Sequence, residues 1–112
     1  MNIAEVILSR GADVAEALLY RDCAVTYREL RESVFRVASG LLARGCLKGD
    51  RVGIFSENSP FFVSAYLGII RAGLAAVPFQ TEVSKDSFLE IVSNTGMRHL
   101  FVSNRFLNRL DT

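Results

Sequence analysis

The sequence is short of the residues that most catalytic and nucleic-acid-binding classes require. Its 112 residues hold one histidine and two cysteines, and 13 Lys and Arg nearly balance 12 Asp and Glu. A chain without a basic cluster is not expected to bind nucleic acid or an anionic membrane surface, because both demand clustered Lys and Arg. The opening MNIAEVILSRGAD lacks the charged start and long apolar centre of a secretory signal. Cys23 and Cys46 show no CxxC spacing, so both are interpreted as reduced structural thiols, which favours a cytoplasmic protein.

The motifs of several ligand-binding classes are also missing. There is no GxGxxG, no GxxxxGK[ST] and no GxSxG. GLLARGC, residues 40–46, has two glycines at phosphate-loop spacing, but a cysteine replaces the lysine and the segment ends a predicted helix. The spacing of Gly45, Gly49 and Gly53 indicates a turn before a strand. His99 stands alone at a predicted strand start, which is more often a structural position than a catalytic one.

The longest apolar stretch is PFFVSAYLGIIRAGLAAVPF, residues 60–79, with a single charge at Arg71. Three explanations compete: a membrane span, a buried layer of a soluble domain, or part of a core whose other half is missing. A bilayer helix would hold Arg71 near its middle together with Gly73 and Pro78, at a cost of several kcal/mol. The stretch is therefore interpreted as a helix over 60–72 followed by a strand. Because this helix is apolar on nearly every side, it needs cover on more than one face, which favours an incomplete core.

The second half of the chain alternates apolar runs with helical patterns. This order predicts a parallel sheet with right-handed crossovers. The expected fold class is α/β, a Rossmann-like three-layer segment in which residues 1–112 form one unit without an internal boundary. The strands are expected at 51–55, 74–79 and 99–103, with helices at 60–72, at 84–96 and from Asn104.

The first half predicts a helix, a hairpin and a second, longer helix. Ile3–Leu8 fits a short helix, and residues 17–27 fit two strands that turn at Arg21 and Asp22. Thr26 and Glu29 have the spacing of a capping box, which marks the start of the longer helix. The apolar residues of that helix recur with a period of 3.6 at Tyr27, Leu30, Val34, Val37, Ala38 and Leu41.

SENS, residues 56–59, is the best local candidate for a binding site. It follows the carboxyl end of a predicted strand, where open α/β sheets bind their ligands, so Glu57 and Asn58 are candidates to line a crevice. The alternative, which the local pattern favours, is a polar turn in which Ser59 caps a helix that starts at Pro60. No catalytic, cofactor-binding or metal-binding residue is assigned.

Several segments together resemble the start of the adenylate-forming superfamily, which includes acyl- and aryl-CoA synthetases, luciferases and peptide-synthetase adenylation domains. VTYREL, residues 25–30, is similar to the family's TYxEL motif, and IIRAGLAAVPFQ is similar to its second motif. The SENSP turn looks most like the CoA-ligase and luciferase branch. Arg71 stands where many members carry lysine, and Gln80 departs from the usual Asn, Asp or Leu. The resemblance covers residues 14–104.

This resemblance implies the N-terminal part of a larger domain in an enzyme that activates a carboxylic acid with ATP and Mg²⁺. An acyl-adenylate forms, pyrophosphate leaves, and CoA then takes the acyl group. The family's phosphate loop, its acidic Mg-associated motif, its ribose-binding aspartate and its catalytic lysine lie downstream of the matched motifs. None of them has a counterpart here, so the chain alone is not expected to catalyse adenylation.

Two functional hypotheses follow. In the first, the chain is part of an acid-CoA ligase of fatty acid or aryl acid metabolism, and its partner is the remainder of that ligase. In the second, it is a natural short binding or regulatory module that pairs with a partner chain or with itself through apolar surface on the 60–72 helix. An unrelated Rossmann-like nucleotide binder is disfavoured by the absent glycine fingerprint.

Overall fold

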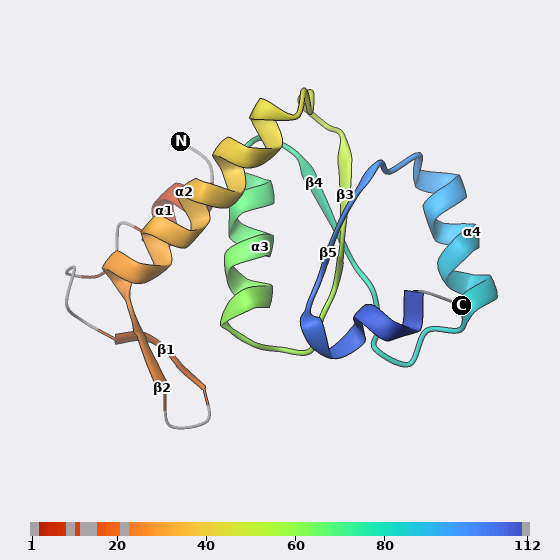
Figure 1. Ribbon diagram of the computed structural model, residues 1–112. Coiled ribbons are helices and arrows are strands. Elements are labelled where there is room, and N and C mark those ends of the chain that lie inside the picture. The colour runs from red at the N-terminus through yellow and green to blue at the C-terminus, as the bar shows by residue number, and fades with distance from the viewer. Residues whose placement is uncertain (1–2, 9–10, 12–15, 21–22, 111–112) are drawn as a thin grey trace.

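The computed structural model describes residues 3–8, 11, 16–20 and 23–110 and contains two small sheets (Figure 1). One is an antiparallel hairpin and the other is a parallel sheet of three strands in the order β4-β3-β5. The α/β class and the parallel sheet predicted from the sequence are confirmed. The elements are α1 (Ile3–Leu8), β1 (Glu16–Tyr20), β2 (Cys23–Thr26), α2 (Tyr27–Ala43), β3 (Arg51–Phe55), α3 (Pro60–Arg71), β4 (Ala75–Pro78), α4 (Lys85–Thr95), β5 (His99–Val102) and a final 3-10 helix (Asn104–Leu110).

The hairpin and the elements that follow it agree closely with the sequence pattern. β1 and β2 pair as expected, and the predicted turn at Arg21 and Asp22 lies outside the described residues. The last element is not the α-helix expected from Asn104: Asn104–Leu110 form a 3-10 helix. The predicted strands at 74–79 and 99–103 are each shorter by one or two residues.

The helices begin where the sequence places capping residues. The capping box is complete: the Glu29 N–H donates to Thr26 Oγ1 at 3.2 Å, and the Thr26 N–H donates to Glu29 Oε1 at 3.0 Å. Ser59 caps α3, with Pro60 in the first turn, and Ser84 caps α4. Gly96 ends α4 with a φ of 68°, a left-handed conformation that glycine adopts without strain.

Strand β3 is the centre of the parallel sheet, with β4 on one side and β5 on the other. The first connection runs from β3 through α3 to β4, and the second runs from β4 through α4 to β5 on the far side of β3. Because both crossovers of a parallel sheet are right-handed, the two helices lie on opposite faces. Figure 1 shows α3 and α4 on opposite sides of the sheet, with α1 and α2 outside α3.

Helix α3 is covered on two sides, which corrects the expectation of an incompletely covered helix at 60–72. The sheet packs against one side of α3, and α1 and α2 pack against another. Ala65, Leu67 and Ile69 are buried, and of its large apolar side chains only Phe61 and Tyr66 are exposed. The sequence pattern missed this because it gave no sign that α1 and α2 fold back over α3.

The described residues contain no helix that is both long and apolar enough to cross a membrane. The apolar stretch from Pro60 to Phe79 is one helix and one strand, as interpreted from the sequence.

Gly68 sets the close approach of α3 to α2. A Cβ built at Gly68 would clash with the side chain of Val37 and would lie 3.2 Å from the carbonyl oxygen of Val34. The Val34 oxygen belongs to the backbone of α2 and cannot move independently of that helix. The two helices therefore pack at this distance only with glycine at position 68.

We expect Gly68→Ala to destabilise the fold by about 1–3 kcal/mol, because the added methyl group forces α2 and α3 apart. Gly40→Ala is the matched control in α2, since a Cβ there meets only the Arg44 guanidinium, at 3.5 Å. This control should stabilise the helix by about 0.5–1 kcal/mol. Urea denaturation of both variants measures the two effects, and equal stability of the Gly68 variant and the wild type would contradict the packing argument.

Candidate functional site

A groove of about 550 Å³ opens at the carboxyl ends of β3 and β4. Residues 56–58 line it after β3 and residues 80–82 line it after β4, with Phe62 and Phe79 among the apolar lining residues. The chain leaves β3 toward α3 on one face and leaves β4 toward α4 on the other, so the two loops diverge here. Doubly wound sheets bind their ligands outside the carboxyl ends of their strands, which is where this groove lies.

The SENS turn is held together by its own hydroxyl groups. The buried Ser56 hydroxyl lies 2.8 Å from the Glu57 carbonyl oxygen and 2.9 Å from Glu57 Oε1. The Ser59 hydroxyl donates to the Glu57 carbonyl at 3.2 Å and accepts from the Phe62 N–H at 3.3 Å. Both interpretations of this segment are therefore realised, because Ser59 caps α3 while Glu57 and Asn58 line the groove.

Glu57 joins the turn after β3 to the segment after β5. Its carboxylate lies 3.8 Å from Arg105 Nη1, and the buried hydroxyl of Ser103 faces it without completing a hydrogen bond of good geometry. The largest single effect on the pKa of Glu57 is partial burial, which by itself raises the pKa. The Ser56 and Ser103 hydroxyls, the Glu57 backbone and the Arg105 charge together outweigh burial, so the net pKa of this carboxyl lies below its usual value.

The charge of the groove disfavours phosphate as a ligand, although Arg105 offsets part of the Glu57 charge. Glu57 and Glu82 line it, and no Lys or Arg is among its lining residues. The phosphates of ATP, which the family resemblance implies, do not fit such a surface, because carboxylates repel them. Within the described ranges, no three His, Cys, Asp or Glu side chains gather as metal ligands. The groove residues Glu57 and Glu82 are therefore not suited to hold the phosphates of ATP.

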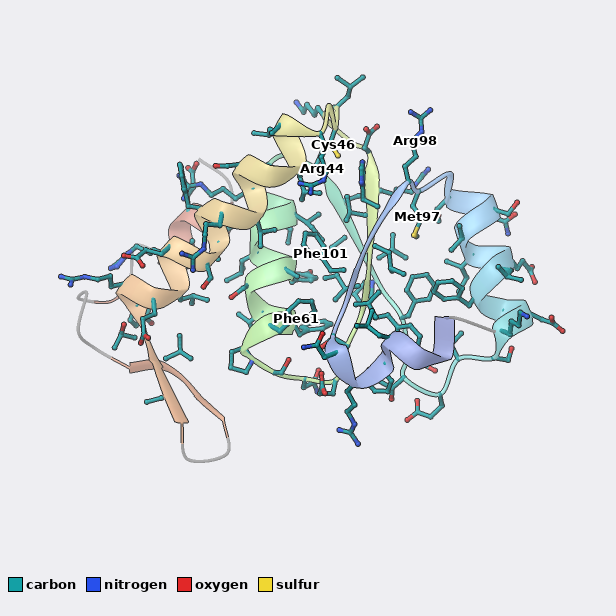
Figure 2. The ribbon with its side chains drawn as sticks, viewed as in Figure 1. Arg44, Cys46, Phe61, Met97, Arg98 and Phe101 are labelled. Atoms are coloured by element: carbon teal, nitrogen blue, oxygen red, sulfur yellow. The ribbon has the colours of Figure 1, made fainter. Side chains whose placement is uncertain are left out.

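The lone histidine, the charged residues at the start of β3 and one of the two cysteines lie at the opposite, amino-terminal edge of the sheet. His99 begins β5 there. The Asp50 carboxylate accepts from the Leu47 N–H at 2.9 Å and supports a turn. The Arg51 guanidinium donates to the Thr95 carbonyl, at the carboxyl end of α4, at 3.2 Å. Cys46 is a buried free thiol at this end (Figure 2), whereas the side chain of Cys23 lies outside the described residues.

The glycines at the amino-terminal edge have structural roles. Gly45 and Gly49 occupy turns with φ near 85°, as the predicted turn before the strand requires. Gly53 lies in β3, and a Cβ there would come within 2.9 Å of the side chains of Leu100, Met97 and Phe79. The structure thus separates these residues from Glu57 and Asn58, and it brings no pair of candidates together as acid and base.

Sequence reasoning missed Ser103 and Arg105. Both follow β5 in the sequence. They lie beside Glu57, which follows β3, only because β5 is the neighbour of β3 in the sheet. Ser103 could have been found from the sequence, because it is a polar residue directly after a predicted strand. The SENS turn was chosen as a candidate site on the same ground.

We expect Glu57→Gln to lower the free energy of unfolding by about 0.5–1.5 kcal/mol at pH 7, through loss of charge-assisted contacts to Ser56 and Arg105. Folding lowers the pKa of Glu57, so the ionised carboxylate stabilises the folded state fully above the ordinary glutamate pKa of about 4.3. This stabilisation is lost as the pH falls through the lower pKa of the folded state. Thermal melts from pH 7 to pH 2 should therefore show the difference from wild type shrinking in acid.

Glu90→Gln, at an exposed position of α4, is the control for this prediction and should show no such pH-dependent difference. A Glu57→Gln difference that persists undiminished at pH 2 would show that the carboxylate charge is not its cause.

Comparison with known proteins identifies the family. The sequence model described as AMP-binding enzyme matches residues 9–112. The chain is 34% identical over 112 residues to 3-hydroxybenzoate--CoA/4-hydroxybenzoate--CoA ligase of Thauera aromatica, covering 96% of this chain and 21% of that protein. It is 33% identical over 96 residues to a linear gramicidin synthase chain of Brevibacillus parabrevis, covering 86% of this chain and 1% of that one.

Solved structures show the same architecture. The anthranilate CoA ligase AuaEII, in complex with anthranoyl-AMP, superposes with a TM-score of 0.90 at 26% identity, over 99% of this chain and 22% of that chain. The N-terminal subdomain of NpsA from Klebsiella oxytoca superposes with a TM-score of 0.80 at 26% identity, over 94% and 28% of the two chains. The chain thus spans about a fifth of the length of the CoA ligases it matches. It belongs to the AMP-binding enzymes, the adenylate-forming superfamily, and corresponds to an N-terminal segment of that family.

Proposed function

We propose that the chain is part of an ATP-dependent ligase that activates a carboxylic acid as its acyl-adenylate and passes the acyl group to CoA. The observation that carries this proposal is the match to a hydroxybenzoate–CoA ligase over 96% of the chain. The anthranilate ligase, of similar fold, supports an aryl acid over an amino acid as the substrate, and a fatty acid is the next candidate. ATP, Mg²⁺ and CoA belong to this proposal as cofactors of the whole enzyme.

Within that enzyme, residues 1–112 act as one structural segment that contributes no catalytic, cofactor-binding or metal-binding residue. Two features support this assignment. The groove at the carboxyl ends of β3 and β4 is lined by Glu57 and Glu82 and by no Lys or Arg, and the hydroxyl groups of Ser56 and Ser59 hold a turn. The free thiol of Cys46, buried in the core, supports a cytoplasmic location, where cysteines remain reduced.

The alternative, a natural short binding module, has little support from the exposed surface of residues 60–72. That hypothesis relied on apolar surface along residues 60–72, and the structure leaves only Phe61 and Tyr66 exposed there among large apolar side chains. The remainder of a ligase chain is therefore the partner we favour.

ATP–pyrophosphate exchange tests the proposed function. We expect the longer ligase to catalyse exchange in the presence of an aryl acid, and residues 1–112 alone to give none above background. The reason is that none of the groups lining the groove after β3 and β4 is a cation that could stabilise a transferring phosphoryl or adenylyl group. Exchange by residues 1–112 alone would contradict the structural role. Absence of exchange by the longer protein with aryl, fatty and amino acids alike would contradict the ligase proposal.

A further inference from the structure

The amino-terminal edge of the parallel sheet carries another pocket, whose charge is opposite to that of the groove at the carboxyl ends. Its volume is about 300 Å³, at the lower end of the range for small-ligand sites. Arg44, Arg51 and Arg98 line it, and Asp50 is the one carboxylate among its described lining residues. With His99 neutral, three arginines and one aspartate give the pocket a net charge of +2.

The fold assembles this positive charge from three separate segments. Arg44 directly follows α2, Arg51 begins β3, and Arg98 lies between α4 and β5. Because β3 and β5 are parallel neighbours, the segments that precede them meet at one edge of the sheet. The sequence therefore shows no basic cluster, although the structure has one.

The three guanidinium groups keep most of their N–H donors available. Arg44 Nη1 donates to the Gly40 carbonyl at 3.2 Å, and Arg51 Nη1 donates to the Thr95 carbonyl at 3.2 Å. The Arg98 guanidinium forms no hydrogen bond or ion pair with any described residue, and Figure 2 shows its side chain extending outward from the sheet edge. Since a guanidinium has several N–H donors, these groups can bind an oxyanion and keep their present contacts.

Two groups at the pocket oppose an anion. The Asp50 carboxylate is one, and it already accepts from the Leu47 N–H. The other is the carboxyl end of α4, because the end of a helix carries about half a negative charge. Arg51 bonds to this helix end through the Thr95 carbonyl and offsets its partial charge. The other two arginines therefore leave the pocket positive by more than one unit charge.

We propose that this pocket binds a phosphate group, either inorganic phosphate or the end group of a phosphate monoester. A phosphate monoester carries a charge of about −1.5 to −2 at pH 7, which matches the pocket better than the single charge of a carboxylate. Arg44 and Arg98 are assigned as its main partners, because guanidinium groups bind phosphate oxygens through paired N–H donors. This site lies at the opposite edge of the sheet from Glu57, and the inference does not depend on the proposed function.

Calorimetric titration of the full natural chain, without ATP, tests the class of ligand. Methyl phosphate and methanesulfonate are matched probes, because both are tetrahedral and differ in charge. At constant ionic strength and about pH 7, methyl phosphate should bind about tenfold more tightly. Equal affinities, or no binding of methyl phosphate, would overturn the inference.

Inorganic phosphate distinguishes the two sources of the group. If it binds at least as tightly as methyl phosphate does, the free anion is the ligand. If methyl phosphate binds more tightly, the ligand is a monoester. Both results support the site.

Substitutions test whether the binding occurs in this pocket. Arg98→Gln removes an exposed side chain without a described partner, so it should fold normally and weaken methyl phosphate binding about tenfold. Arg98→Lys keeps the charge and loses the paired donors, so it should weaken binding about threefold.

Arg28→Gln is the matched control. Arg28 is exposed at the start of α2, about 24 Å from Arg44 along the helix, and its loss should leave the affinity unchanged. Wild-type affinity in Arg98→Gln, or an equal loss in Arg28→Gln and Arg98→Gln, would overturn the assignment of the site.

Discussion

The handedness of the two crossovers is the constraint on which the rest of the structure depends. Since β4 and β5 flank β3 on opposite sides, right-handed connections must place α3 on one face and α4 on the other. Strand β3 is then covered on both faces, which explains why Val52, Ile54 and Phe55 are all buried despite their alternating directions. The same reversal makes the loops after β3 and β4 diverge and creates the groove at their carboxyl ends.

Much of this architecture could be predicted from local sequence. The capping box at Thr26 and Glu29, the Ser59–Pro60 helix start and the glycine at position 96 each act within a few residues, and each was found where predicted. The cover of α3 by α1 and α2 could not be read in this way, because it depends on contacts between distant segments. A periodic pattern shows that a helix has an apolar face and does not show what packs against that face.

The candidate site shows the same division. The position of Glu57 after a strand predicted that it would line a groove, whereas its contacts with Ser103 and Arg105 depend on strand order. The groove lies where α/β sheets bind ligands, but Glu57 and Glu82 line it and would repel a phosphate group. This disagreement fits a chain that supplies structure to an AMP-binding enzyme and leaves phosphate binding to other segments.

The central claim is that these residues are one segment of a longer acid-activating ligase. Sequencing the native transcript beyond the codon for Thr112 tests it most directly. The account predicts an open reading frame that continues into a Ser/Thr/Gly-rich loop ending in Pro-Lys-Gly, the phosphate loop of the family. A stop codon directly after Thr112 would contradict it.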